Sequence, residues 1–103
     1  MRLARKIRHE QTRRESEEYL EMVMFRDSWN DLLSLFDSYF GAPLKTSGKD
    51  ANDDAERVSN PHGGISKEQV LYHVLRDNAD HVAMIWPWSD GKRMTVKILQ
   101  QTL

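Results

Sequence analysis

The chain has 103 residues, 39% hydrophobic and 30% charged, with a formal net charge of -1. A chain of this length forms about one domain with a single core, and the composition is typical of soluble proteins. It has no cysteine, which excludes disulfides, thiolate catalysis and cysteine-ligated metals. No apolar run approaches the ~20 residues of a membrane span, and no secretory signal is evident. We therefore expect a single-domain cytoplasmic protein.

The charge is distributed unevenly along the chain. Residues 1–14 carry six basic side chains and one acidic one, a net charge of +5, so the remaining residues carry -6. We expect residues 1–18 to form a basic helical arm in front of a single domain over residues 19–103. Such an arm can contact phosphate, or it can pair with the glutamates that follow it. Its candidate nucleic-acid contacts are Arg2, Arg5, Lys6, Arg8, Arg13 and Arg14.

Residues 5–26 are mostly good helix formers and include no glycine or proline, which predicts a helix. Its second half holds a dense apolar run from Tyr19 to Phe25, which fits either a buried helix or a short strand. The flanking glutamates favour the helix. We expect Tyr19, Met22 and Phe25 to offer apolar surface to a partner.

A second helix is predicted from Ser28 to Phe40. Ser28 is a suitable N-cap, Asp31 favours the positive end of the helix dipole, and apolar side chains recur at helical spacing. Gly41 suits the C-terminal cap. An aromatic stripe on a helix more often belongs to the hydrophobic core than to a cofactor site, so we expect this one to be core.

Residues 45–64 are rich in Gly, Ser, Asn, Asp and Pro, which predicts a flexible linker. Oxygen ligands alternate over residues 50–54, as in a calcium loop. The position of the required glycine is Ala55, however, and the closing acid would fall on Pro61. A solvated acidic loop is therefore the better interpretation.

A further helix is predicted over residues 67–77. Ser66 and Gln69 have capping-box spacing, and Ile65 and Val70 are placed for a hydrophobic staple. His73 and Asp77 share a face of this helix, but His81 lies beyond its end. We therefore expect no metal site and no cofactor.

Residues 81–99 predict a β-hairpin that turns at Ser89-Asp90-Gly91. Pro87 cannot donate a ladder hydrogen bond, which favours a turn with Gly91 as a left-handed bulge and Trp88 opposite Lys92. In that register Trp86 shares the core face with Met94, Val96 and Ile98. We expect a buried Trp86 and a binding tip formed by Trp88, Lys92 and Arg93.

Together these elements predict an α+β fold of two or three helices followed by a C-terminal β-hairpin, with a winged-helix-like arrangement as one form. No nucleophile, base or paired acids are spaced for catalysis, so we expect no enzyme. The favoured function is a small adaptor or regulatory module that binds a protein partner and forms a homodimer. The alternative is a winged-helix-like nucleic-acid-binding protein that uses the basic arm and the hairpin.

Overall fold

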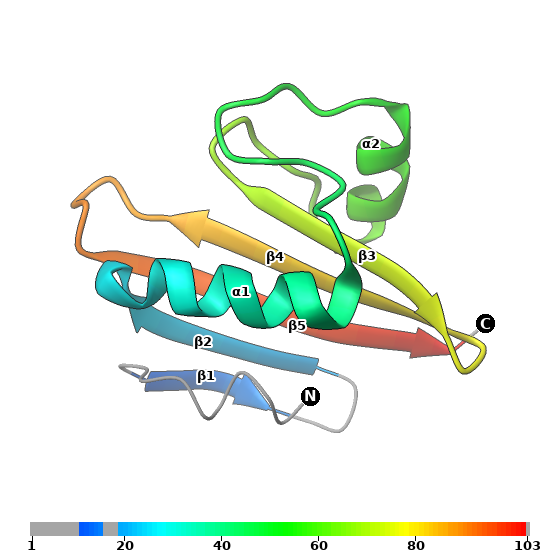
Figure 1. The fold of residues 1–103 in the computed structure, drawn as a ribbon, viewed down its shortest axis with the longest axis horizontal. Coiled ribbons are helices and arrows are strands. Elements are labelled where there is room, and N and C mark those ends of the chain that lie inside the picture. Colours follow the sequence, from blue (N-terminus) through cyan, green and yellow to red (C-terminus); the bar gives the residue numbers. More distant parts are fainter. Residues whose placement is uncertain (1–10, 16–18, 103) are drawn as a thin grey trace.

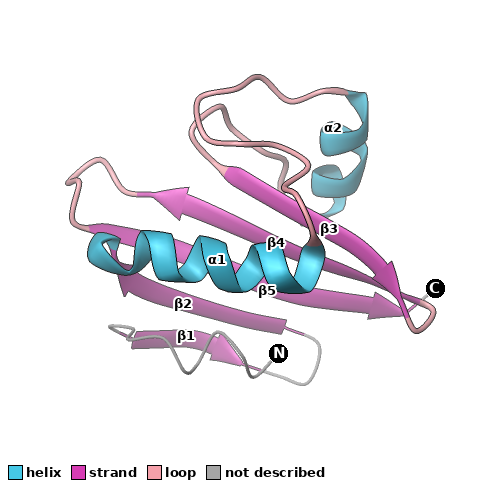
Figure 2. Ribbon diagram, viewed as in Figure 1, coloured by secondary structure: helices cyan, strands magenta, loops and turns pink. Residues whose placement is uncertain are grey.

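The computed structural model describes residues 11–15 and 19–102 and shows an α+β fold built on one antiparallel sheet. Five strands, β1 to β5, lie in the order β1-β2-β5-β4-β3 (Figures 1 and 2). Two α-helices, α1 and α2, pack on it. The strands are β1 (Gln11–Glu15), β2 (Tyr19–Phe25), β3 (Val70–Arg76), β4 (Ala79–Pro87) and β5 (Arg93–Thr102), and the helices are α1 (Trp29–Phe40) and α2 (Asp53–Ser59).

The two helices cover opposite faces of the sheet, with α1 in front of it in Figure 1 and α2 on the far side. Strand alternation sends side chains to both faces in turn. On the α1 face, Leu20, Ile98, Ala83 and Tyr72 form one row across four strands. The second face holds a separate apolar cluster beneath α2: Ala55, Val58, Leu71, Val82, Met84 and Leu99. The sheet therefore has a core on each side.

The apolar run Tyr19–Phe25 is strand β2, so the helix predicted over residues 5–26 is wrong wherever the structure describes that range. Residues 11–15 are also a strand, while residues 1–10 and 16–18, the rest of the predicted arm, lie outside the described residues. Met22 and Met24 pack beneath α1, and Val23 is buried on the opposite face. A strand covered on both faces has no polar alternation, which is why its sequence resembles a buried helix.

The helix predicted from Ser28 is confirmed as α1, which ends at Phe40. Gly41 follows with a φ of +83° and a ψ of -161°, so glycine ends the helix as expected, in a positive-φ conformation that lies outside the usual left-handed cap region. The Ser28 side chain makes no capping hydrogen bond to the helix. Phe36, fully buried, packs edge-on against both Phe40 and Tyr72, so the aromatic stripe is core, as expected.

The segment predicted to be a linker contains helix α2. Asn52 caps its N-terminus by accepting from the Ala55 amide at 2.8 Å, and both Ala55 and Val58 are buried against the sheet. The low apolar content of this segment predicted a linker. The helix forms nevertheless, because its two apolar residues, Ala55 and Val58, both lie on the side that meets the sheet.

The helix predicted over residues 67–77 is also wrong, because most of this stretch is strand β3 (Val70–Arg76) and residues 67–68 form a turn before it. One of the two capping-box hydrogen bonds forms: the Gln69 side chain accepts from the Ser66 amide at 2.6 Å. It closes a turn, however, in which the Gln69 amide donates to the Ser66 carbonyl. Asp77 and Asn78, both with positive φ, then connect β3 to β4 by a two-residue turn. With a strand at the place of the recognition helix, the winged-helix-like arrangement is absent from the described residues.

The predicted C-terminal hairpin is present as β4 and β5, but its register differs from the prediction. Gly91 has the expected positive φ, and its amide bonds the Trp88 carbonyl at 3.2 Å. The loop includes Lys92 as well, so the Trp88 amide bonds the Arg93 carbonyl at 2.9 Å. Pro87 therefore lies opposite Met94 at a position that donates no hydrogen bond to β5. Pro87 therefore does avoid a donor position, as predicted, but through a loop one residue longer than the predicted one.

The change of register exchanges the two faces of the hairpin. Ala83, Ile85 and Pro87 now lie with Met94, Val96 and Ile98 on the α1 face, and Trp86 lies opposite Thr95 on the other. Trp86 was predicted to be core, but 51% of its surface is exposed.

Candidate binding groove

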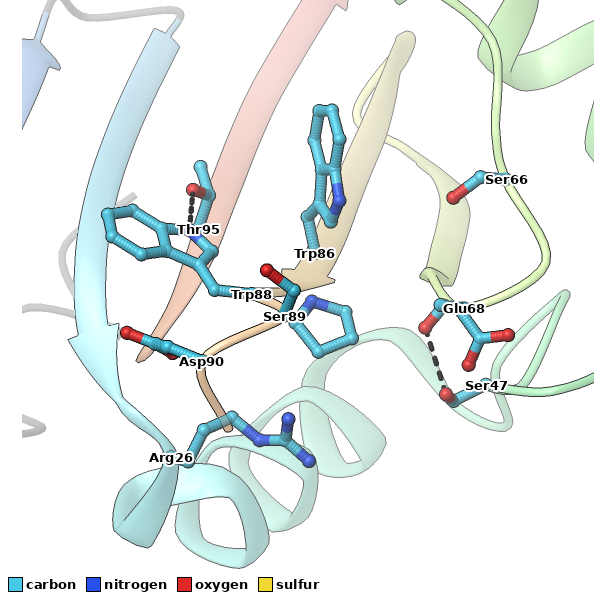
Figure 3. Close-up of a pocket in the computed structure, with 10 residues that line it drawn as sticks. Arg26, Ser47, Ser66, Glu68, Trp86, Trp88, Ser89, Asp90 and Thr95 are labelled. Carbon is cyan, nitrogen blue, oxygen red and sulfur yellow. Dashed lines mark hydrogen bonds between the residues drawn. The ribbon is translucent and has the colours of Figure 1, made fainter. Parts of the chain in front are cut away.

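A groove on the second face of the sheet surrounds Trp86. It consists of two neighbouring hollows of about 770 and 550 Å³ that share Trp86 and Ser66. Hollows of this size are in the range of ligand sites. The first is lined by residues of the hairpin tip and of the loops before β3 (Figure 3), and the second by residues of α2 and the segment that follows it.

The first hollow exists because β4 is longer than β3 at this end of the sheet. Val70, the first residue of β3, pairs with Ile85, and the preceding residues turn away. Trp86 and Pro87 thus extend past the end of β3. Proline is suited to this open edge because no neighbouring strand needs a donor from it. The sheet therefore presents a tryptophan where the covering strand is missing.

The wall facing Trp86 is held by the ammonium group of Lys45. This side chain is only 4% exposed, and its Nζ donates to the carbonyls of Lys67 and Gln69, both at 2.6 Å, and of Thr46 at 3.1 Å. All three ammonium donors are therefore used. Burial lowers the pKa of Lys45, and the charges of Glu68 and Asp50 partly oppose that shift.

Further bonds join the same two loops. The Ser47 hydroxyl donates to the Glu68 carbonyl at 2.8 Å, and the Gly48 amide donates to the Lys67 carbonyl at 2.9 Å. The Lys45 backbone also forms a β-bridge with Leu71. The segment after α1 is thereby fixed to the start of β3.

The opposite wall is the hairpin tip, which Asp90 organises. Its carboxylate accepts from the amides of Lys92 at 2.8 Å and Arg93 at 3.1 Å, and from the Arg93 guanidinium at 3.2 Å. The hydrogen bond from the Lys92 amide is the largest of the contributions that lower the pKa of Asp90. Trp88 is fixed as well, because its indole N–H donates to the Thr95 hydroxyl at 2.8 Å. This wall is therefore rigid around Trp86.

Arg26, directly after β2, lies at the lower end of the first hollow in Figure 3. Its guanidinium stacks over the Trp29 ring at 4.8 Å, which fixes the cation by a face contact and leaves its N–H edges available. At the other end, in the second hollow, burial lowers the pKa of His62. The first hollow therefore combines an exposed indole with the oriented cation of Arg26, and Lys97 lines the second hollow.

The structure separates the residues expected to bind a partner. Met22 is fully buried under α1 and unavailable, and Tyr19 packs beside the α2 cluster with its hydroxyl bonded to Glu21. Phe25 is half-buried in β2. Trp88 lines the groove, whereas Lys92 is exposed and Arg93 half-buried in the tip.

The sequence analysis did not predict three features of the groove. These are the exposure of Trp86, the place of Arg26 in its lining, and the role of Lys45 in holding one wall. The signal for Trp86 was present, because a four-residue loop also satisfies Pro87 and turns this tryptophan away from the core. Arg13 and Arg14 of the basic arm lie in β1, and the other basic residues of the arm lie outside the described part of the chain.

The pairs and clusters that could suggest catalysis or metal binding have structural partners. His73 pairs with Asp80 at 2.7 Å, and His81 bonds both the Tyr39 hydroxyl and the Arg76 carbonyl. Among the described residues, no cluster of three metal-ligating side chains occurs. No helix in this part of the chain is long and apolar enough to cross a membrane.

Comparisons of the chain with protein-family models, curated proteins and solved structures find no match. Function is therefore inferred from the groove itself.

We predict that Lys45→Met will lower the free energy of unfolding by about 2–4 kcal/mol, because three charge-assisted hydrogen bonds disappear and buried carbonyls lose their donor. Urea unfolding followed by circular dichroism measures this loss. Lys49→Met, at an exposed position of the same loop, is the matched control and is expected to change stability little. Equal unfolding midpoints for the two variants would contradict the role assigned to Lys45.

Proposed function

We propose that this protein is a small, non-enzymatic interaction module of the adaptor or regulatory kind that binds a protein partner through the groove around Trp86. The observation that carries the proposal is the exposure of this side chain. Within the described residues, Trp86 and Leu75 are the large hydrophobic side chains that are exposed, and of these two only Trp86 lines a hollow. The cytoplasmic location expected from the sequence remains part of this proposal.

Two properties of Trp86 support a binding role. Half of a large aromatic surface faces solvent, although the fold offers a core on both faces of the sheet that could have covered it. Its neighbours Trp88 and Asp90 are fixed by hydrogen bonds. Binding of a partner over the ring therefore costs little conformational entropy in the hairpin tip. Tryptophans in such rigid, concave settings supply much of the binding energy at protein interfaces.

We predict that Trp86→Ala will abolish capture of protein partners from a native lysate, because the central apolar contact is lost. Leu75→Ala is the matched control, since Leu75 is 58% exposed but lies outside both hollows. Capture by the tagged full chain, with and without nuclease, measures the difference. Partners that bind both variants equally well would refute the role of Trp86.

A homodimer is also part of this proposal, although Met22, which was expected to face a partner, is buried under α1. Sedimentation equilibrium at micromolar concentrations tests the homodimer; a single monomeric species well above that range would exclude it.

Nucleic-acid binding is a second candidate, because the chain combines a basic N-terminal segment with an exposed indole on which a base could stack. If it is correct, affinity for an oligonucleotide should fall roughly tenfold or more between low and moderate salt. Replacing Arg2, Arg5, Lys6 and Arg8 by glutamine should abolish the binding. This variant is preferable to truncation through Arg14, which would remove most of β1. Affinity unchanged by salt would exclude this candidate.

A further inference from the structure

The free polar groups that line the first hollow are mainly hydrogen-bond donors. The indole N–H of Trp86 makes no hydrogen bond to another described residue, and its nitrogen lies on the ring edge toward Ser66 and Glu68 in Figure 3. The Arg26 guanidinium points into the hollow and forms no ion pair with any described residue. Ser66 adds a hydroxyl. A ligand of this hollow must therefore present acceptors.

The carboxylates that line the same hollow do not cancel this preference. Asp90 is committed to the amides and guanidinium of its own loop. The carboxylate of Glu68 points away from Trp86 in Figure 3. At the end of the first hollow away from the indole, the charge available to a ligand is the positive charge of Arg26, so a negatively charged group is the complementary one there.

The backbone at the groove excludes one common way of binding a peptide. A partner strand added to the open end of β4 would require a donor from Pro87, which has no N–H. A bound chain must instead be held through side chains and through its own carbonyls. An extended polyproline-type segment fits this demand, because its carbonyls are exposed and its rings pack on tryptophan.

We infer that the first hollow binds an extended, proline-containing acidic segment of a partner protein, with a proline ring on Trp86 and a carboxylate on Arg26. This inference rests on the proposed function and names the partner's chemistry. The second hollow, which shares Trp86, continues the groove and gives room for neighbouring residues of the same segment. A nucleic-acid strand is less suited, because Arg26 is the one basic residue among the described residues that line the first hollow, and the wall of the second hollow that holds Lys97 also holds Glu56.

The test uses the full chain and a short acetylated peptide in which a run of prolines is followed by glutamates. Calorimetry measures affinity, and the indole N–H signals in NMR spectra, assigned with Trp86→Phe, locate the site. One comparison peptide has lysines in place of the glutamates, and another has glycines in place of the prolines. We expect the acidic proline peptide to bind about tenfold more tightly than either and to shift the Trp86 signal.

Variants of Arg26 separate charge from folding. Arg26→Gln should weaken binding of the acidic peptide about fivefold to tenfold and leave the lysine peptide unchanged, whereas Arg26→Lys should retain most of the affinity. Arg57→Gln, an exposed arginine of α2 outside both hollows, is the control, and thermal unfolding verifies that every variant is folded.

Equal affinity for the acidic and lysine peptides, or for the proline and glycine peptides, would overturn the inference. So would an unchanged affinity in Arg26→Gln, or tighter binding of an oligothymidylate at the same site. If no peptide binds while partner capture still depends on Trp86, the inference fails and the proposed function stands. If capture does not depend on Trp86, the proposed function itself fails.

Discussion

The sheet carries apolar side chains on both faces, and the remaining structure follows from the need to cover both of them. Leaving either apolar face in water would forfeit a large part of the burial that a chain of this size can gain. Helix α1 covers one face with Phe36 and its aromatic neighbours. The short helix α2 covers part of the other with Ala55 and Val58. The groove lies on that second face, beside the area that α2 and its loops cover.

Lys45 shows how the chain passes from one layer to the other without leaving polar groups unpaired. The segment after α1 has to reach α2 on the far side, and in doing so it runs along the edge of β3. A buried ammonium group is costly unless every donor is used, and here three carbonyls from two segments surround it. The lysine therefore connects the two loops and shapes one wall of the groove.

The hairpin shows the same connection between local geometry and surface chemistry. One additional loop residue decides which face Trp86 occupies, since a change of one residue in register exchanges the faces of a strand. Asp90, which bonds two amides of its own loop, stabilises the four-residue form. The exposed indole is therefore a consequence of loop length, which places Trp86 opposite Thr95 on the second face. A binding role for this ring accounts for its being left uncovered.

The sequence by itself determined the features that depend on local interactions. Helix α1 with its glycine terminus, the C-terminal hairpin, the turn glycine at Gly91 and the constraint from Pro87 could all be predicted, because each follows from backbone conformation within a few residues. The contact between Ser66 and Gln69 was also predicted correctly, but it closes a turn before a strand. Only the tertiary structure decided that Tyr19–Phe25 and Val70–Arg76 are strands. Short apolar runs buried on two sides lack the alternation that distinguishes a strand from a helix, so their conformation is set by the strands beside them and by the helices that cover the sheet.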